Sequence, residues 1–313
     1  MVKHSQAPAS RLNAGEIPTL LELYENPERK QNAVGVILDV TRTYKTNSSY
    51  DFITRVKLID QSFNPTVVKY RHNKKYIHVF IFTRYVDEAP VFHRVGDILY
   101  LQSFDFEHYT DDGNEVKAKK KSHSKFMIFD GSPACRDYHL LNPSKREVFA
   151  SDKAIQREID RLREFNRNFF AQNSLTDLKW FGKLTINFSQ CDTGDTDLIL
   201  RLVDKTDVLP NNVITYTLQD ARGQKFYLQL EPRQKLDRGD LLKVRSICKI
   251  ATNGRMHANF YTSILKIPPF FYDAQHKDIF KYEIIREDQL ADGYKSDEGE
   301  FDLEAENYST FLG

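Results

Sequence analysis

The chain has 313 residues, about twice the length of a typical domain, so its length predicts two domains. Hydrophobic residues make up 40% and aromatic residues 12%, which is enough for two hydrophobic cores and excludes disorder over most of the chain. The excess of 22 Phe and 16 Tyr over 1 Trp and 3 Met favours β-strands. The 3 cysteines lie far apart and form no CxxC pair, which indicates a reducing compartment.

Charge is distributed unevenly along the chain. The net charge of +1 argues, taken alone, against a nucleic-acid ligand. Residues 287–313, however, contain nine acidic residues and one lysine, a net charge of −8, so the preceding 286 residues carry +9. A basic body with an acidic tail is typical of a module that binds a polyanion. A disordered acidic end without a role is the alternative interpretation.

Residues 1–15 are predicted to form a flexible arm. They lack the apolar core of a signal peptide, and no run in the chain approaches the roughly 18 apolar residues of a membrane helix. The expected location is therefore the cytosol or the nucleus.

Strand-like runs begin at Ala33. They read AVGVILDVTRTY, DFITRVKLID, KKYIHVFIF, GDILYLQSFDFEHY and SKFMIFDG. Turn signals such as Asn47-Ser48 and Asp112-Gly113 lie between them. Five strands in about a hundred residues predict a small barrel or sandwich, which we place at residues 16–149.

One amphipathic helix is predicted at residues 150–175. Ile155, Ile159, Leu162, Phe165 and Phe169 recur at steps of three and four residues, which is the spacing of a helix with one apolar face. The helix separates two β regions.

A second β region is predicted at residues 176–286, before an acidic tail at 287–313. Its runs read DLILRLVDKTD, VITYTLQDARG, QKFYLQLEP, GDLLKVRSICKI and MHANFYTSILKI. In each half a strand ends near an aspartate (Asp60, Asp220), and a Gly-Asp turn (at Gly96 and Gly239) opens a long strand. This layout suggests an internal duplication of one five-stranded unit.

No catalytic or cofactor-binding motif is present. The patterns GxxxxGK[ST], HExxH, GxSxG and GxGxxG are all missing. His123, Cys135 and His139 come nearest to a metal site, but their spacing matches no known ligand set. We therefore expect a binding protein with no catalytic residue, no metal and no cofactor.

Three stretches carry the residue types that hold single-stranded nucleic acid, namely aromatic side chains for base stacking and Lys or Arg for phosphates. The first is Thr41–Asn47, and the second follows His108-Tyr109, where no acid interrupts residues 116–125. The third has Lys243 and Arg245 on one strand and Phe260-Tyr261 near its end. The lysines of the second stretch are Lys117, Lys119, Lys120, Lys121 and Lys125. A solvated hairpin tip or a nuclear-import signal is the alternative for those lysines, and core packing is the alternative for Phe82, Phe260 and Tyr261.

At these residues the sequence resembles the telomere end-binding protein alpha subunit and protection-of-telomeres family of the ciliate type. The shared segments are VILDVTRTYKTN, TRVKLID, FIFTRYVDEAP and VFHRVGDILYLQSFDF, followed by REIDRLREFNRNFF, LQDARGQKFY and GDLLKVRS. The resemblance runs from about Pro18 to Phe271. It implies a mostly β protein with two tandem OB folds, five-stranded β-barrels joined by the helix.

The resemblance also implies a set of DNA contacts. Tyr44, Lys45, Thr46 and Asn47 would meet DNA at one loop, Lys57 from a strand, Phe82 and Tyr109 as stacking platforms, and Lys243, Arg245, Phe260 and Tyr261 in the second barrel. The sequence departs from the family at the Lys-rich stretch Thr110–Lys125 and lacks an aromatic residue near Leu209–Val213. It ends before the third OB-like domain of longer members, so partner binding through that domain is not implied.

The expected function is binding of the single-stranded G-rich 3′ overhang of telomeres in the nucleus, which would protect the chromosome end and regulate telomerase access. Telomere-capping or telomerase subunits are possible partners, and no membrane contact is expected. The alternatives are an OB-fold paralogue that acts as a protein-interaction scaffold in such a complex, and a general single-strand or RNA-binding protein.

Overall fold

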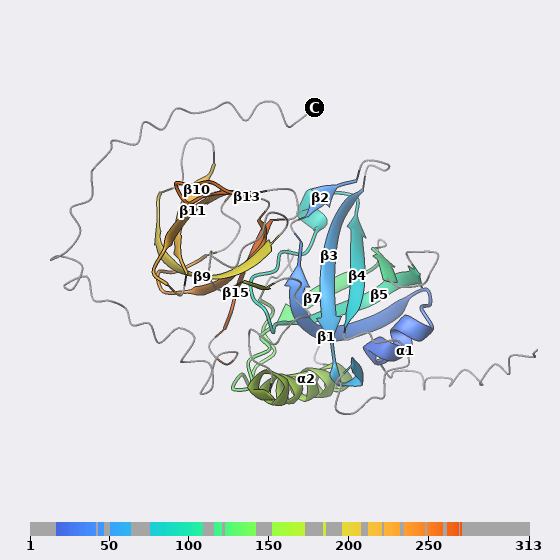
Figure 1. The fold of residues 1–313 in the computed structure, drawn as a ribbon. Helices are drawn as coiled ribbons and strands as arrows, with labels where there is room; N and C mark the ends of the chain where they lie inside the picture. Colours follow the sequence, from blue (N-terminus) through green and yellow to red (C-terminus); the bar gives the residue numbers. More distant parts are fainter. Residues whose placement is uncertain are drawn as a thin grey trace, which may run out of the picture.

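The two β regions fold into two barrels that lie side by side in the computed structural model (Figure 1). The expected N-terminal arm and acidic tail lie outside the residues that the structure describes. Those residues are 17–41, 43–46, 51–63, 76–108, 116–120, 123–141, 152–172, 184–185, 196–207, 212–220, 222–231, 235–247, 249–258, 262–268 and 270.

The first barrel is closed by five strands. They are β1 (Gln31–Val40), β3 (Phe52–Ile59), β4 (Ile77–Thr83), β5 (Ile98–His108) and β6 (Val116–Lys119). They pair in the order β1-β3-β4-β6-β5, and β5 returns to β1. The β4–β6 pair is parallel and the others are antiparallel. This is the five-stranded Greek-key order of the OB fold that the family resemblance implies. The fifth strand of the barrel is β6, in the Lys-rich stretch where the sequence predicts a loop, and the predicted strand SKFMIFDG forms β7 (Lys125–Phe129) beside β5.

Short elements complete this first unit. The strand β1 is buried along most of its length, as its continuous apolar run predicts, because neighbouring elements cover both of its faces. The helix α1 begins with a capping box in which the Thr19 hydroxyl accepts from the Glu22 amide. The remaining elements are α1 (Leu20–Glu25), β2 (Tyr44–Lys45), η1 (Gln61–Phe63), η2 (Val86–Glu88) and β7 (Lys125–Phe129).

The second sheet repeats the pairing pattern of the first. Its path is β13-β14-β11-β10-β9-β12-β15, with β8 beside β9. The pairs β9–β10 and β10–β11 are antiparallel and β11–β14 is parallel, as in β1-β3-β4-β6. The strands are β8 (Leu184–Thr185), β9 (Thr196–Lys205), β10 (Ile214–Gln219), β11 (Lys225–Leu230), β12 (Leu241–Ile247), β13 (Lys249–Ile250), β14 (Arg255–His257) and β15 (Ser263–Lys266).

The Gly-Asp turns are equivalent in the two units, which supports the expected duplication. The Gly96 amide donates to the Ile37 carbonyl (2.8 Å), and the Gly239 amide donates to the Leu202 carbonyl (2.8 Å). The backbone carbonyl of the aspartate after each glycine accepts in return from the amide of Ile37 in the first unit and of Leu202 in the second. Both glycines have positive φ angles, 86° and 92°, which a residue with a Cβ adopts only at a cost.

The helix α2 (Lys153–Gln172) packs beneath the first barrel (Figure 1). Its five predicted apolar residues are all buried in the hydrophobic core of the first unit. Asn166 donates to the carbonyls of Gly96 (2.8 Å) and Gly131 (2.9 Å), and Arg163 donates to the Asp130 carbonyl (3.0 Å). The helix is therefore an integral part of the first unit as well as a connection to the second.

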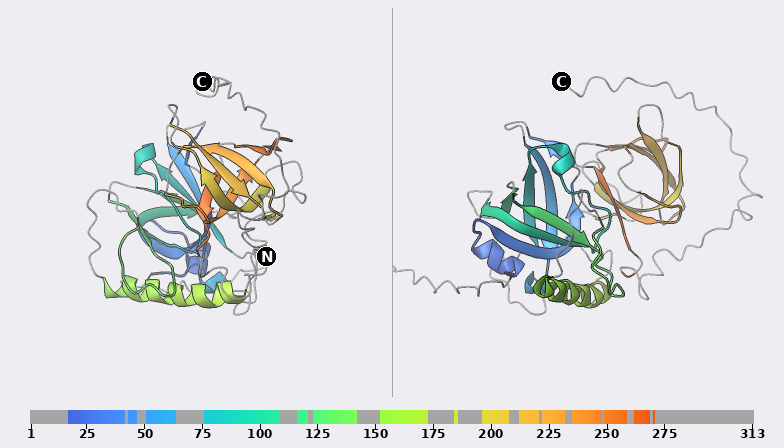
Figure 2. Two further views of the ribbon diagram at one scale, coloured as in Figure 1. Left: turned by 90° about the vertical axis from the view of Figure 1, so that its left-hand side faces the viewer. Right: turned by 180° about the vertical axis from the view of Figure 1, so that it is seen from behind.

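The two barrels share a packed interface. Ile199, Leu241, Leu265 and Ile267 of the second unit belong to the core cluster of the first. The backbone of Lys266 accepts from Val95 (3.0 Å) and donates to His93 (2.8 Å), which links β15 to the first barrel. Seen from behind, the two barrels again lie side by side (Figure 2, right). Neither of the described helices is long and apolar enough to span a membrane.

Candidate nucleic-acid interface

The outer face of β3, β4 and β6 collects aromatic and cationic side chains. Strand pairing places Arg55 opposite Phe80, Lys57 opposite His78, and Lys119 opposite Phe82. Successive residues of a strand face opposite sides, so the neighbours of Phe80 point inward. Val79 and Ile81 accordingly lie in the core cluster, whereas Phe80 and Phe82 do not. Phe80 is nevertheless only 1% exposed, because Arg55 and His78 cover its ring, whereas Phe82 is partly exposed. In an OB fold this is the face that binds oligonucleotides.

Four cations and four rings alternate on this face, and we call them the platform: Arg55, Lys57, Tyr76, His78, Phe80, Phe82, Lys117 and Lys119. Arg55 lies 4.8 Å from the ring centre of Phe80, Lys57 lies 4.9 Å from that of Tyr76, and Lys117 lies 5.8 Å from that of Phe82. The His78 ring is 5.0 Å from that of Tyr76. Tyr76, His78 and Phe82 are partly exposed, whereas Phe80 is buried and supports its neighbours. Accessible rings that stack on bases, beside cations that follow phosphates, are the components of a single-strand groove.

The loop between β1 and β3 joins one edge of the platform. Tyr44, half-buried, pairs with Ile53, and Ile53 pairs with Phe82 on the next strand. Lys45 is exposed, and the Thr46 amide and hydroxyl both donate to the Asp51 carbonyl (3.1 Å each). The structure thus places Tyr44 in the same sheet as Phe82, two strands away, with Lys45 and Thr46 following it. Asn47 lies outside the described residues.

Acidic residues form ion pairs with two lysines of the Lys-rich stretch. Lys117 pairs with Glu107 of β5, and Lys120 lies 3.8 Å from Glu88 of η2, while Lys119 is exposed. The sequence suggests an unbroken cluster because no acid interrupts residues 116–125. The barrel supplies acids from other strands, so Lys119 is the most accessible cation of the three. Tyr109 and Lys121 lie outside the described residues.

A buried ion cluster joins the two barrels at Asp39 of β1. The Asp39 carboxylate is 1% exposed and contacts Lys243 Nζ (3.1 Å), Arg245 Nε (2.8 Å) and Lys57 Nζ (3.7 Å). Lys243 is itself only 2% exposed. The expectation that Lys243 contacts DNA therefore requires correction, because its ammonium group is held inside the protein against Asp39. Arg245, 21% exposed, keeps partial access to solvent.

The surroundings of Asp39 decide its protonation. Burial alone would raise the pKa of Asp39, but the positive charges of Lys243, Arg245 and Lys57 outweigh this effect and lower the pKa below 3.8. The carboxylate is thus ionised at neutral pH. It compensates buried positive charge from the second barrel and orients Lys57 of the platform.

Two further features of this interface have a signal in the sequence. Tyr76, His78, Phe80 and Phe82 occupy every second position of the run YIHVFIF, the two-residue period of one strand face. Asp39 is an acid inside the apolar run VGVILDV, and Lys243 is a base inside LLKV. Charges of opposite sign in two apolar strands are a signal for a buried ion pair.

The second barrel presents Tyr227 on its equivalent face. Tyr227 of β11, 37% exposed, pairs with Thr217 of β10 and with exposed Arg255 of β14. These strands correspond to β3, β4 and β6 of the first barrel. Tyr227 thus supplies an exposed aromatic group on this face of the second barrel. Phe260 and Tyr261 lie outside the described residues.

Replacing Tyr227 by Ala is expected to weaken single-strand binding about fivefold to tenfold, because one stacking ring is lost. Fluorescence anisotropy with a labelled oligonucleotide measures this change. Tyr227→Phe keeps the ring and should bind like the original protein. Equal loss in both variants would show that the hydroxyl group, and not stacking, is responsible.

Among the described residues no group of three or more His, Cys, Asp or Glu side chains could hold a metal ion. His123, Cys135 and His139, considered from the sequence, do not form such a group. The interface consists of rings, cations and hydroxyl groups, which are suited to binding.

Comparisons with known proteins agree with this chemistry. The family described as "Telomeric single stranded DNA binding POT1/CDC13" matches residues 13–176. The "Telomere-binding protein 51 kDa subunit" of Euplotes crassus is 22% identical over 275 residues, which cover 82% of this chain and 58% of that protein. The chain thus spans less than two thirds of that relative's length.

Solved structures with similar chains include fission yeast Pot1 with single-stranded DNA, at 15% identity and a TM-score of 0.38, covering 86% of this chain and 94% of that one. A replication protein A heterotrimer bound to single-stranded DNA matches at 11% identity and a TM-score of 0.39, covering 82% and 52%. Because these TM-scores are low, we assign the OB fold from the strand order of the sheets and not from these superpositions.

Proposed function

Because the chain belongs to the telomeric single-stranded DNA-binding POT1/CDC13 family, we propose that it binds the single-stranded G-rich 3′ overhang of telomeres through its two OB folds. The observation that carries the proposal is the platform, whose rings and cations alternate on the oligonucleotide-binding face of the first barrel. The Euplotes crassus relative, a telomere-binding protein by its name, supports the telomeric ligand.

The path of the strand follows from the positions of these groups. Bases stack on the partly exposed ring of Phe82, and Lys119 and Lys45 neutralise phosphates beside it. Tyr227 and Arg255 continue the interface on the second barrel, with Arg245 at the junction. Asn47, Tyr109, Phe260 and Tyr261 remain part of the proposed site on the strength of the family resemblance. Lys121 remains part of it because it lies in the Lys-rich stretch.

Covering the overhang in this way protects the chromosome end and controls telomerase access to the 3′ terminus. The protein acts in the nucleus at telomeres, as a binding protein without a catalytic step. Capping or telomerase subunits are its proposed protein partners.

Binding is tested with four ligands at two or more salt concentrations: G-rich telomeric single strand, its C-rich complement, the duplex and the RNA equivalent. We expect preference for the G-rich DNA strand and, for about five neutralised phosphates, a log-log salt slope of about −3.5. Equal affinity for all four ligands would mean that binding depends only on nonspecific electrostatic attraction. Absence of binding would instead favour the role of a protein-interaction scaffold.

A further inference from the structure

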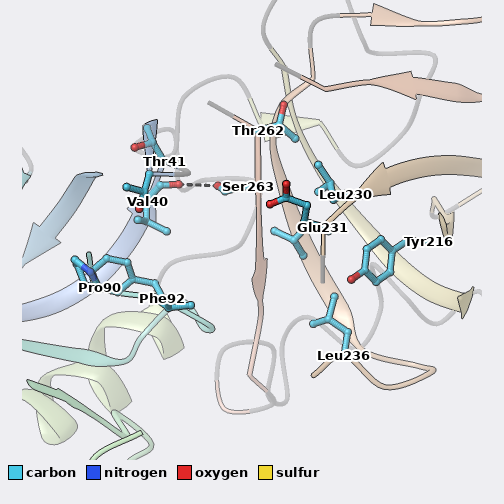
Figure 3. Close-up of a pocket in the computed structure, with 13 residues that line it drawn as sticks. Val40, Thr41, Pro90, Phe92, Tyr216, Leu230, Glu231, Leu236, Thr262 and Ser263 are labelled. Atoms are coloured by element: carbon cyan, nitrogen blue, oxygen red, sulfur yellow. Dashed lines mark hydrogen bonds between the residues drawn. The ribbon is translucent and has the colours of Figure 1, made fainter. Parts of the chain in front are cut away.

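A pocket opens between the two barrels, with a volume of about 80 Å³ (Figure 3). A site for a single water needs only about 10–15 Å³, so the pocket has room for a larger group. The first barrel contributes Val40, Thr41, Thr43, Pro90, Val91 and Phe92 to its walls. The second barrel contributes Tyr216, Leu230, Glu231, Leu236, Thr262, Ser263 and Ile264. A hydrogen bond from the Ser263 hydroxyl to the Val40 carbonyl (2.7 Å) closes one side.

The pocket walls are next in the chain to residues of the proposed DNA interface. Val40, Thr41 and Thr43 directly precede Tyr44 and Lys45 in the chain. On the other side, Thr262 to Ile264 directly follow Phe260 and Tyr261. We therefore expect a single strand that runs from the loop of the first barrel to the second barrel to pass beside this pocket.

The lining favours a base over a phosphate. Valine, leucine and phenylalanine side chains form apolar walls suited to a planar ring. Among the described lining residues Glu231 is the one charged group, and its negative charge repels phosphate. Its carboxylate points across the pocket toward the first barrel (Figure 3). Glu231 is itself exposed, so a ligand can reach it.

A carboxylate selects guanine among the four bases. The Watson–Crick edge of guanine carries two adjacent N–H donors, at N1 and N2, that match the two oxygens of one carboxylate. Adenine and cytosine each place a donor beside an acceptor, and thymine places its one donor between two carbonyls. A carboxylate oxygen facing those acceptors would be repelled.

We propose that one guanine of the bound strand turns out of the stack and inserts into this inter-barrel pocket, where Glu231 accepts from its N1–H and N2–H groups. This inference rests on the proposed function and adds a specific guanine subsite to it. The subsite exists only when both barrels are in place, because each contributes one wall.

The test is a scan in which each guanine of the G-rich oligonucleotide is replaced in turn by inosine, which lacks only the N2 amino group. With the original protein we expect one position at which inosine weakens binding about tenfold. In Glu231→Gln the unmodified strand should bind about tenfold more weakly, and inosine at that position should cost nothing further. Glu25→Gln, an exposed acid on α1, is the matched control and should reproduce the original scan.

The direction of the effect separates this proposal from simple electrostatics. Removing a negative charge near DNA strengthens binding if only long-range attraction matters. Unchanged or stronger binding by Glu231→Gln, with an unaltered inosine profile, would overturn the guanine subsite and leave the proposed function intact. If the original protein fails to bind the G-rich strand at all, the proposed function itself is wrong.

Discussion

Replacing Asp39 by Asn is expected to lower the free energy of unfolding by about 3–5 kcal/mol, the usual cost of removing one partner from a buried ion pair. The amide keeps the shape of the side chain but removes its charge, so Lys243, 2% exposed, loses its ion pair with that carboxylate. Urea unfolding at neutral pH measures the loss. Asp207→Asn, an exposed aspartate after β9, is the control and should change stability by less than about 0.5 kcal/mol.

The double variant Asp39→Asn with Lys243→Met tests the pair directly. If the two charges compensate each other, the double variant should be less destabilised than the sum of the two single variants, by about 1–3 kcal/mol. Arg245 and Lys57 are partly exposed, at 21% and 12%, and can turn toward water. Strict additivity would mean that Asp39 and Lys243 do not interact energetically.

The dependence on pH has a definite sign. The pKa of Asp39 in the folded protein lies below the ordinary value of an aspartate, which the unfolded chain keeps. At a pH between the folded and the unfolded pKa, the unfolded chain binds the proton and the folded chain does not. The stabilisation by Asp39 is therefore complete above about pH 4 and is lost as the pH falls through the lower folded value. The difference in stability between the original protein and Asp39→Asn should be full at pH 7 and should shrink in acid.

Replacing Phe82 by Ala is expected to weaken binding of the G-rich strand by about 1–3 kcal/mol, because a ring on which a base stacks is removed. Phe82 is half-buried, lies outside the core cluster and has Lys117 5.8 Å from its ring centre. Fluorescence anisotropy gives the change in Kd, and circular dichroism checks that the barrel remains folded.

Two comparisons make the Phe82 result specific. Phe82→Tyr keeps a stacking ring and should bind like the original protein. Tyr138→Ala is the control, because Tyr138 also has a cation near its ring, Arg163 at 5.3 Å. The Tyr138 hydroxyl donates to Asp160 of α2, away from the platform. This variant should leave DNA affinity unchanged. A loss below about 0.5 kcal/mol for Phe82→Ala would remove Phe82 from the site.

Much of the fold could be predicted from local patterns. The apolar spacing of Ile155 to Phe169 predicts α2, and the alternation of strand residues predicts two β units. The Gly-Asp turns at Gly96 and Gly239 indicate the duplication, and the structure gives them the same hydrogen bonds. Local patterns are sufficient here because helix periodicity, strand alternation and turn geometry depend on neighbours in the chain.

The assembly of the site depends on contacts between distant residues. Tyr44, Lys57 and Phe82 were predicted from the sequence, yet their grouping with Arg55 and His78 follows from the pairing of β3 with β4. The acids that pair with Lys117 and Lys120 come from other elements, β5 and η2.

The sequence by itself therefore determines that this protein has two β-barrels, a helix and a supply of rings and cations suited to single-stranded nucleic acid. The tertiary structure alone decides that Lys243 is buried against Asp39, that α2 packs on the first barrel, and that a pocket lies between the barrels. The physical reason is that a lysine in an apolar strand has the same local pattern whether it faces water or a carboxylate. Only the packing of one barrel on the other brings that carboxylate, 204 positions earlier in the chain, into contact with it.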